Sequence, residues 1–250
     1  MKSEFDYVSY CWCYDGCVAA DPGIRAIAAL DDELRRGMYT FIRAARRPVT
    51  RDEAAAAVGI SRKLAAFHLD KLVEVGALQA HYAQPGGTRK VGRAPKVYEP
   101  SGADIQVSIP PRSHEMLSGI LLDAVLAQHQ GEDASRVALR VAGQRGEAIG
   151  AAERDQGRPG RLGTERALTL ISGLLERCGF EPAREAPGCV RLRNCPFHPL
   201  ASRAPEMVCG INQAFLAGVV AGLDAPTVEA VLRPHRGECC VELRDRADPS

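Results

Sequence analysis

The chain has 250 residues, of which 46% are hydrophobic and 25% charged, and its formal net charge is +1. A chain of this length and composition can bury a full core in one large or two small domains, and we expect two. Uninterrupted apolar runs of about 18 residues and an N-terminal signal pattern are absent from the sequence, which argues against a membrane protein and predicts a cytoplasmic one without a membrane partner.

Residues 1–20 contain Cys11, Cys13 and Cys17 but no periodicity that would hold through a helix or strand. We expect a disordered tail. Nine cysteines are many for a cytosolic chain, and in a reducing compartment they are more often ligands or catalytic thiols than structural disulfides. The spacing CxC followed by CxxxC, with no matching cluster nearby, indicates metal binding only weakly.

From Pro22 to Ile42 apolar residues recur at steps of three and four, which predicts an amphipathic helix. Thr50 with Glu53 predicts a capping box for a short helix. Ser61 then caps a second helix that begins within a few residues of the end of the first. Two helices joined by so short a turn are typical of a helix-turn-helix motif.

After this helix the sequence alternates, turns at Pro85–Gly87 and returns through Lys96–Glu99, which predicts two strands around a basic glycine-rich loop. Three helices followed by a hairpin predict a winged helix-turn-helix domain over residues 21–100. The residues expected to contact DNA lie at the start of the second helix of the motif and on the wing. They are Ser61, Arg62, Lys63, His68, Arg89, Lys90 and Arg93. Most charge runs are merely a solvated face, but these coincide with the two elements that touch DNA in this architecture.

Residues 111–155 are predicted to form helices, the first of which is a long apolar helix over residues 113–130. Such a helix after a wing commonly packs against its copy in a partner chain, so we expect a homodimer. Residues 163–245 predict a small α+β unit, with a helix near 205–223 and strands near 181–184, 189–193, 228–232 and 239–243. The predicted fold is therefore mainly α with α+β parts: an N-terminal winged helix-turn-helix, a central dimerisation helix and a small C-terminal α+β sensor domain.

The C-terminal cysteines have the spacing of a metal site. Cys195 and His198 form a CxxH pair in a loop, and Cys209 lies at the start of a predicted helix, where backbone dipoles favour a thiolate. Cys239 and Cys240 begin a predicted strand, and adjacent strand residues point to opposite faces, so we expect only one of them to join the site. Three thiolates and one further donor suit an iron-sulfur cluster or a zinc ion, and spacing alone does not separate the two.

Other interpretations of these residues stay open. The thiols can be inert core residues or a thiol-disulfide switch. A small organic effector is an alternative signal, with structural zinc or inert cysteines. A catalytic pair of a cysteine and His198 is the rival from another class, but an orienting acid does not accompany it in the sequence, and we do not expect an enzyme.

The segments "RRPVTRDEAAAAVGISRKLAAFHLDKLVEVGAL", "GRAPKVYEP" and "NCPFHPLA…VCGINQAFLAG…GECCVEL" resemble the ArsR-like winged-helix regulators of bacteria, in particular the branch that includes iron-sulfur repressors of the SufR type. The resemblance implies a homodimeric repressor or activator on a palindromic operator in double-stranded DNA, and it favours the cluster. The chain departs from the pattern near Leu223 and Asp224, where a further cysteine is expected. His198, Cys178, Cys189 or the second residue of the "CC" pair would have to replace it, and an exchangeable or non-protein ligand is another option.

Overall fold

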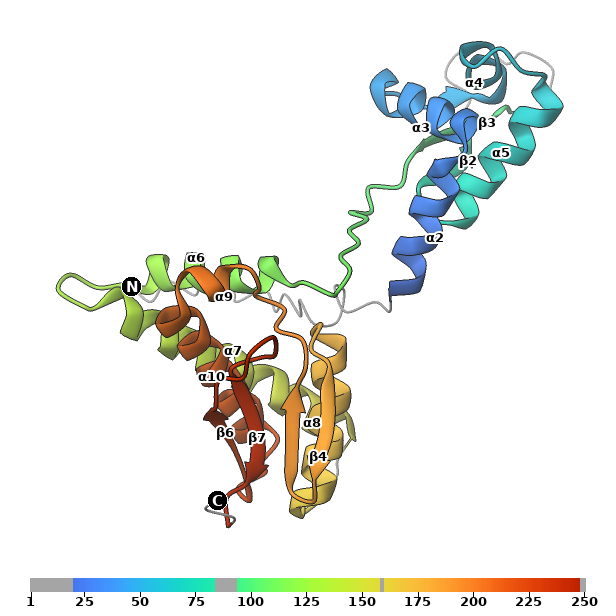
Figure 1. Cartoon of the computed structure of the whole chain (residues 1–250). Coiled ribbons are helices and arrows are strands. Elements are labelled where there is room, and N and C mark those ends of the chain that lie inside the picture. Colours follow the sequence, from blue (N-terminus) through green and yellow to red (C-terminus); the bar gives the residue numbers. More distant parts are fainter. Residues whose placement is uncertain (1–19, 84–93, 158–159, 248–250) are drawn as a thin grey trace. The chain divides into compact units, whose positions relative to one another are not determined.

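The computed structural model describes residues 20–83, 94–157 and 160–247, in two compact units (Figure 1). One unit spans Ala19–Val107 and the other contains Ser108–Ser250. Both combine helices with an antiparallel sheet, so the expected mixture of helix and sheet is observed. The predicted tail lies outside the described residues except for its last residue, as do Cys11, Cys13 and Cys17.

The elements of the N-terminal unit follow one another closely along the chain. They are α2 (Ala20–Asp31), α3 (Glu33–Ala45), β1 (Val49–Thr50), α4 (Arg51–Ala57), α5 (Arg62–Glu74), β2 (Leu78–Tyr82) and β3 (Lys96–Pro100). The strands pair in the antiparallel order β1-β3-β2. Most of the connection between β2 and β3, residues 84–93, lies outside the described residues.

Side-chain caps start three of these helices. Asp32 accepts a hydrogen bond of 2.9 Å from the Arg35 backbone N–H, and this cap divides the single helix predicted in this region into α2 and α3. Thr50 and Glu53 form the predicted capping box of α4. Ser61 caps α5, as predicted, by accepting from the backbone N–H of the third helical residue. These short polar contacts set where the chain turns between α4 and α5.

The core of the N-terminal unit brings α3, α4 and α5 against the sheet. Its largest side chains include Met38 and Ile42 from α3, Leu69 and Leu72 from α5, and Tyr98 from β3, and all five are completely buried. Burial of this apolar surface holds the short helices in place, because helices of seven to thirteen residues are marginal by themselves.

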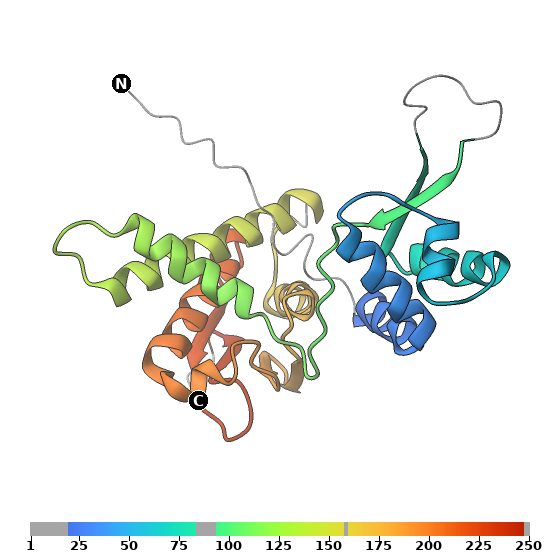
Figure 2. The ribbon, with the colours of Figure 1, turned by 90° about the horizontal axis from the view of Figure 1, so that it is seen from above.

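The C-terminal unit contains more helices and strands than the N-terminal unit. Its elements are α6 (His114–Ala127), α7 (Ala134–Gly157), α8 (Thr164–Arg177), β4 (Pro182–Ala186), β5 (Cys189–Leu192), α9 (Leu200–Arg203), α10 (Pro205–Gly222), β6 (Val228–Leu232) and β7 (Val241–Asp245). Helix α6 lies along α7, and the loop that joins them closes one end of the pair (Figure 2). The four strands pair in the antiparallel order β4-β5-β7-β6.

Helices α7 and α10 approach each other more closely than ordinary side chains permit. Gly146 and Gly150 on α7 face Gly218 and Gly222 on α10. A Cβ atom added at any of these four positions would overlap backbone atoms of the opposite helix; at Gly146 it would overlap the carbonyl oxygen of Phe215. Glycine is therefore required here by close backbone approach.

The sheet of the C-terminal unit has an apolar face and a charged face. Alternate strand residues such as Val190, Val228 and Leu243 belong to the core, which also includes α8 and α10. Residues between them carry ion pairs, including one of 2.8 Å between Arg244 and Glu229. Among the described residues, no helix has both the length and the apolar content that a membrane crossing requires.

Candidate functional site

The turn between α4 and α5 exposes two cations at the start of α5. Arg62 and Lys63 are the first two residues of this helix, and both are exposed. The Nε atom of Arg62 lies 3.2 Å from Oδ1 of Asp52 on α4, but the two side chains are 69% and 64% exposed, so this ion pair is open to exchange with another anion. Ser61 beside them is also exposed and is the cap described above.

The prediction that His68 faces DNA is not met by the structure. The residue is only 6% exposed and belongs to the buried side of α5. Its Nδ1 atom lies 3.9 Å from Oδ1 of Asp32, the cap of α3. The physical reason is helical spacing. His68 lies three residues after Ala65 and four before Leu72, so it shares the face of α5 on which both of these residues are buried.

The same spacing brings two large apolar residues to the surface of α5, and neither was among the residues predicted to contact DNA. Phe67 is 65% exposed and Leu64 is 42% exposed. The signal was available, because a period of 3.6 residues anchored on the buried Leu69 and Leu72 leaves residue 67 on the outer face.

The remaining predicted DNA contacts, Arg89, Lys90 and Arg93, lie outside the described residues. Their charges still contribute to the distribution of charge along the sequence. Residues 19–107 carry 14 Lys and Arg against 10 Asp and Glu, whereas the rest of the chain carries 18 against 21. The excess of positive charge is therefore confined to the segment that contains α4, α5 and the β2–β3 connection.

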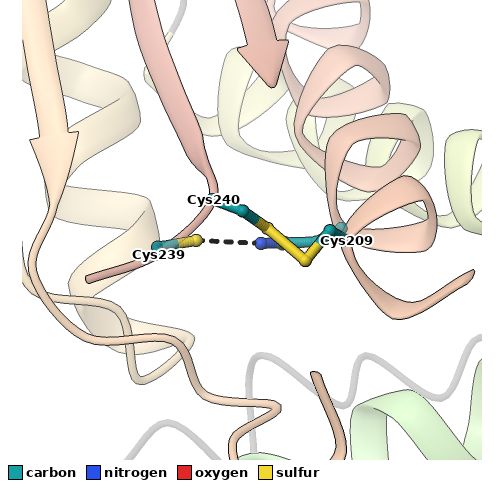
Figure 3. Close-up of a disulfide and its surroundings, with 4 residues drawn as sticks. Cys209, Cys239 and Cys240 are labelled. Carbon is teal, nitrogen blue, oxygen red and sulfur yellow. Dashed lines mark hydrogen bonds between the residues drawn. A yellow bond between two sulfur atoms is a disulfide. The ribbon is translucent and has the colours of Figure 1, made fainter. Parts of the chain in front are cut away.

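Four cysteines meet in the C-terminal unit as two pairs, Cys209 with Cys240 and Cys195 with Cys239. Figure 3 shows the disulfide and the neighbouring Cys239. Cys209 in the first turns of α10 and Cys240 form a disulfide, with their Cα atoms 6.2 Å apart, well within the range that a disulfide spans. Cys239 points the other way and accepts a hydrogen bond of 3.1 Å from Nδ2 of Asn212, which is buried one turn after Cys209 on α10. The side chain of Cys239 is also hydrogen-bonded to Cys195.

Both members of the "CC" pair thus contact another cysteine, which corrects the expectation that only one joins the group. The expectation assumed a strand, but β7 begins at Val241, and Cys239 and Cys240 lie in the preceding loop. They do point in different directions, and a sulfur of the group lies on each side: Cys195 near Cys239, and Cys209 near Cys240.

The thiols of Cys195 and Cys239 differ in acidity. The pKa of Cys195 falls from 9.0 to about 7, because Cys239 donates a hydrogen bond to its thiolate and the backbone N–H groups of Phe197 and His198 do the same, against the opposing effect of burial. The pKa of Cys239 is raised, because its proton is held in the hydrogen bond to Cys195 and the thiol is buried. Cys195 is therefore the thiolate of this pair and Cys239 the thiol.

His198 does not join the cysteines as a ligand in this structure. Its side chain is exposed, and its backbone carbonyl contacts His114. Among residues 20–83, 94–157 and 160–247, no group of three or more His, Cys, Asp or Glu side chains has an arrangement that could hold a metal. The disulfide leaves Cys195 and Cys239 as the only free thiols of the group, fewer than the ligands that zinc or a cluster requires, so a metal-loaded form needs the disulfide reduced.

The cysteine loop is anchored to the chain segment before α6. Asn194 is 6% exposed, and its Nδ2 donates bonds of 2.8 Å to the carbonyl oxygens of Pro111 and Gly179. Arg112 donates to Oδ1 of Asn194 and, over 3.0 Å, to the carbonyl oxygen of Cys195. Two more contacts join the same segments: Ser113 N–H to the Pro196 carbonyl, and His114 Nε2 to the His198 carbonyl, both 2.9 Å.

Cys178 and Cys189, the other possible replacements for a missing ligand, belong to other elements of the unit. Cys178 is the buried C-cap of α8, and Cys189 is the first residue of β5. The chain was compared with protein-family models, curated proteins and solved structures, and none of the three comparisons finds a match.

Proposed function

We propose that this chain is a dimeric DNA-binding transcriptional regulator of the winged-helix type, whose affinity for DNA responds to the redox or metal state of Cys195, Cys209, Cys239 and Cys240. The observation that carries the proposal is the exposed, cationic first turn of α5, which follows α4 after only four residues. In a helix-turn-helix protein the second helix enters the major groove with its N-terminal residues against base edges and phosphates.

Three features support the DNA-binding part. Arg62 and Lys63 are exposed in the first turn of α5, and the exposed ion pair of Arg62 to Asp52 can be replaced by one to phosphate. The free backbone N–H groups of a helix N-terminus attract anions. The β2–β3 connection, which carries Arg89, Lys90 and Arg93, is the proposed wing.

The test uses a duplex selected from a random DNA library by the full-length chain. Arg62→Ala and Lys63→Ala are each expected to lower the slope of log affinity against log salt by about 0.9, the value for one phosphate contact. Arg166→Ala on α8 is the matched control, since Arg166 is an exposed arginine of the other unit, and it should leave the slope unchanged. Failure to select any sequence, or equal slopes in all variants, would overturn the DNA-binding proposal.

The response at the cysteines is supported by the anchored loop. The residues that carry Cys195 are bonded to Pro111–His114, which is the stretch of chain through which Val107 continues into α6. A change in the bonding of Cys195, Cys239 or the disulfide therefore acts on the start of α6. Allosteric coupling is typically worth about 1–3 kcal/mol, or a change in affinity of about five- to 150-fold.

Helix α6 supports the dimer. Leu122, Val125 and Leu126 are 60%, 69% and 76% exposed and share one face, at steps of three and four residues. A second copy of α6 would cover this face, and a two-fold dimer matches a palindromic operator. Leu126→Glu is expected to give a monomer in light scattering with lower affinity for the selected duplex; a dimer of unchanged stability would rule out this face.

The cysteine response is tested by comparing reduced and oxidised protein on the selected duplex. Disulfide formation removes a proton and an electron from each of two thiols, and the electrons pass to an oxidant such as a low-molecular-weight disulfide. We expect affinities at least about fivefold apart, a difference that Cys209→Ser and Cys240→Ser abolish and the control Cys189→Ser retains. Iron and zinc are measured in protein purified anaerobically, where the proposed cluster or zinc ion would bind the reduced thiols. Equal affinities in the reduced, oxidised and metal-loaded forms would refute the response.

A further inference from the structure

The outer face of α5 presents large apolar side chains to solvent. Phe67 is 65% exposed and Leu64, one turn before it on the same face, is 42% exposed. The opposite face of the helix is ordinary core, with Leu69 and Leu72 completely buried. Single exposed apolar residues are ordinary on a folded surface, but Phe67 and Leu64 are adjacent and together form a small apolar patch.

The ring of Phe67 packs edge-on against a buried neighbour. The rings of Phe67 and His68 meet at 74° with their centroids 5.4 Å apart. His68 is itself buried in the core, and its Nδ1 atom lies 3.9 Å from Oδ1 of Asp32, the residue that caps α3. The exposed ring of Phe67 therefore has a buried residue against one side.

The surroundings of the patch identify the kind of ligand. Arg62 and Lys63 lie before it on α5, and acidic residues are absent from the first turn of this helix. Lys71 lies one turn beyond Phe67 and is paired with Glu74 at 3.0 Å. An apolar centre beside exposed cations, whose ion pairs are open to solvent, fits a polyanion that carries apolar groups in a groove. In the major groove of DNA the apolar group is the 5-methyl of thymine.

We propose that Phe67, together with Leu64, reads thymine methyl groups and so determines which bases this chain prefers. The inference rests on the proposed DNA-binding function and deepens it from binding to base preference. Phosphate contacts by Arg62 and Lys63 place the helix without reading sequence, whereas an apolar side chain in the groove distinguishes thymine from the other bases. The structure thereby assigns separate tasks to neighbouring residues of one helix.

The experiment removes the methyl group and leaves base pairing intact. In the duplex selected by the full-length wild-type chain, each thymine is replaced in turn by deoxyuridine. Wild-type protein is expected to lose about three- to tenfold in affinity at one or two thymines of each half-site, the range for one buried methyl contact. Phe67→Ala is expected to bind the thymine and uracil duplexes equally at one of those positions.

Three further variants make the test specific. Arg62→Ala should keep the preference for thymine while its salt dependence falls. Ile27→Ala removes another exposed apolar residue of the same unit, 51% exposed on α2, and should change neither the thymine preference nor the salt dependence. Phe67→Leu keeps an apolar side chain at this position and is expected to retain part of the thymine preference. Far-UV circular dichroism checks that each variant is folded.

The outcomes separate this inference from the proposed function. Salt-dependent binding of a selected duplex without any loss on uracil substitution, or a methyl preference that survives in Phe67→Ala, would overturn the assignment of Phe67 and leave DNA binding standing. Phe67→Ala that binds both duplexes like wild type but changes the mass of the protein in solution would show a protein-docking role instead. If no duplex is selected, the proposed function itself fails, and the inference fails with it.

Discussion

In the N-terminal unit the proposed ligand-contacting groups lie together on residues 61–67 and are exposed, whereas in the C-terminal unit four cysteines from residues 195–240 meet in and around the core. Surface charges act through electrostatics that salt screens. Buried or half-buried sulfurs act through covalent bonds and hydrogen bonds, which salt hardly affects. Ligand binding at α5 should therefore depend on ionic strength, whereas the state of the cysteine pairs should depend on oxidants or metals.

The difference extends to what holds each site in place. Short caps and a small local core position α4 and α5. The cysteine pairs depend on α10, the strand β7 and the loop before α9 all being packed correctly, which in turn depends on the glycine contact between α7 and α10. Damage to distant packing should therefore abolish the cysteine site and spare α4 and α5.

The largest effect tests this dependence directly. Gly146→Leu forces a side chain into the backbone of α10, so we expect the C-terminal unit to lose about 4 kcal/mol or more in the free energy of unfolding. Chemical denaturation should then show the C-terminal transition at lower denaturant and the N-terminal one unchanged. Gly173→Ala on α8, where an added Cβ meets nothing within 4 Å, is the control and should stabilise by about 0.5–1 kcal/mol. A single shared transition in Gly146→Leu would mean that the units do not unfold separately.

The disulfide is expected to contribute the next largest effect. It closes a loop between residues 31 apart in sequence, so Cys240→Ser should lower the free energy of unfolding of the C-terminal unit by about 2–4 kcal/mol under oxidising conditions. The same variant should match the wild type once both are reduced. If Cys240→Ser also lowers the stability of the N-terminal unit, or if the loss of stability persists in reductant, then the disulfide does not stabilise the C-terminal unit in the way described.

How far each half follows from sequence reflects the same contrast. The capping box at Thr50, the cap at Ser61 and the two strands of the hairpin were predicted, because each depends on residues a few positions apart. The strand β6 was also predicted at its observed bounds. Local hydrogen bonding and periodicity are enough to place such elements.

The pairing of the cysteines was not predictable in this way. Two cysteines 31 residues apart meet because α10 and the loop before β7 are packed together, and spacing in the sequence carries no record of that. An error of two residues in the start of β7 was enough to give Cys239 and Cys240 the wrong environment. His68 was placed wrongly and Phe67 was missed for another reason, because the helical period of α5 was not used to decide which face each residue lies on.

A pH experiment compares the thiols at a smaller scale. The pKa of Cys195 is about 7, below its ordinary 9.0, so its thiolate predominates above pH 7. Stability from this group is fully present above about pH 9 and is lost as the pH falls through 7. Alkylation of Cys195 by iodoacetamide, located by mass spectrometry, should therefore show a midpoint near pH 7.

Removal of the donor to Cys195 should reverse the shift. In Cys239→Ala the thiolate loses its first hydrogen-bond donor, so the pKa should rise by about one unit or more and the alkylation rate at pH 7 should fall about fivefold or more. Cys189→Ser, on β5, should leave the midpoint of Cys195 where it is. A wild-type midpoint near pH 9, or no change in Cys239→Ala, would contradict the proposed hydrogen bond.

The smallest effect on stability should accompany a measurable effect on binding. Asp52→Asn removes the carboxylate 3.2 Å from Arg62, and because both side chains are largely exposed, the free energy of unfolding should change by only about 0.5 kcal/mol or less. Affinity for the selected duplex should nevertheless rise a few fold, since Asp52 no longer competes with phosphate for Arg62 and a negative charge is removed beside the DNA. The double variant Asp52→Asn with Arg62→Ala should bind only slightly more tightly than Arg62→Ala alone. This remaining gain is the general effect of removing a negative charge beside the DNA, and it falls as the salt concentration rises. If Asp52→Asn instead weakens binding, then the ion pair positions Arg62 for DNA and does not compete with it.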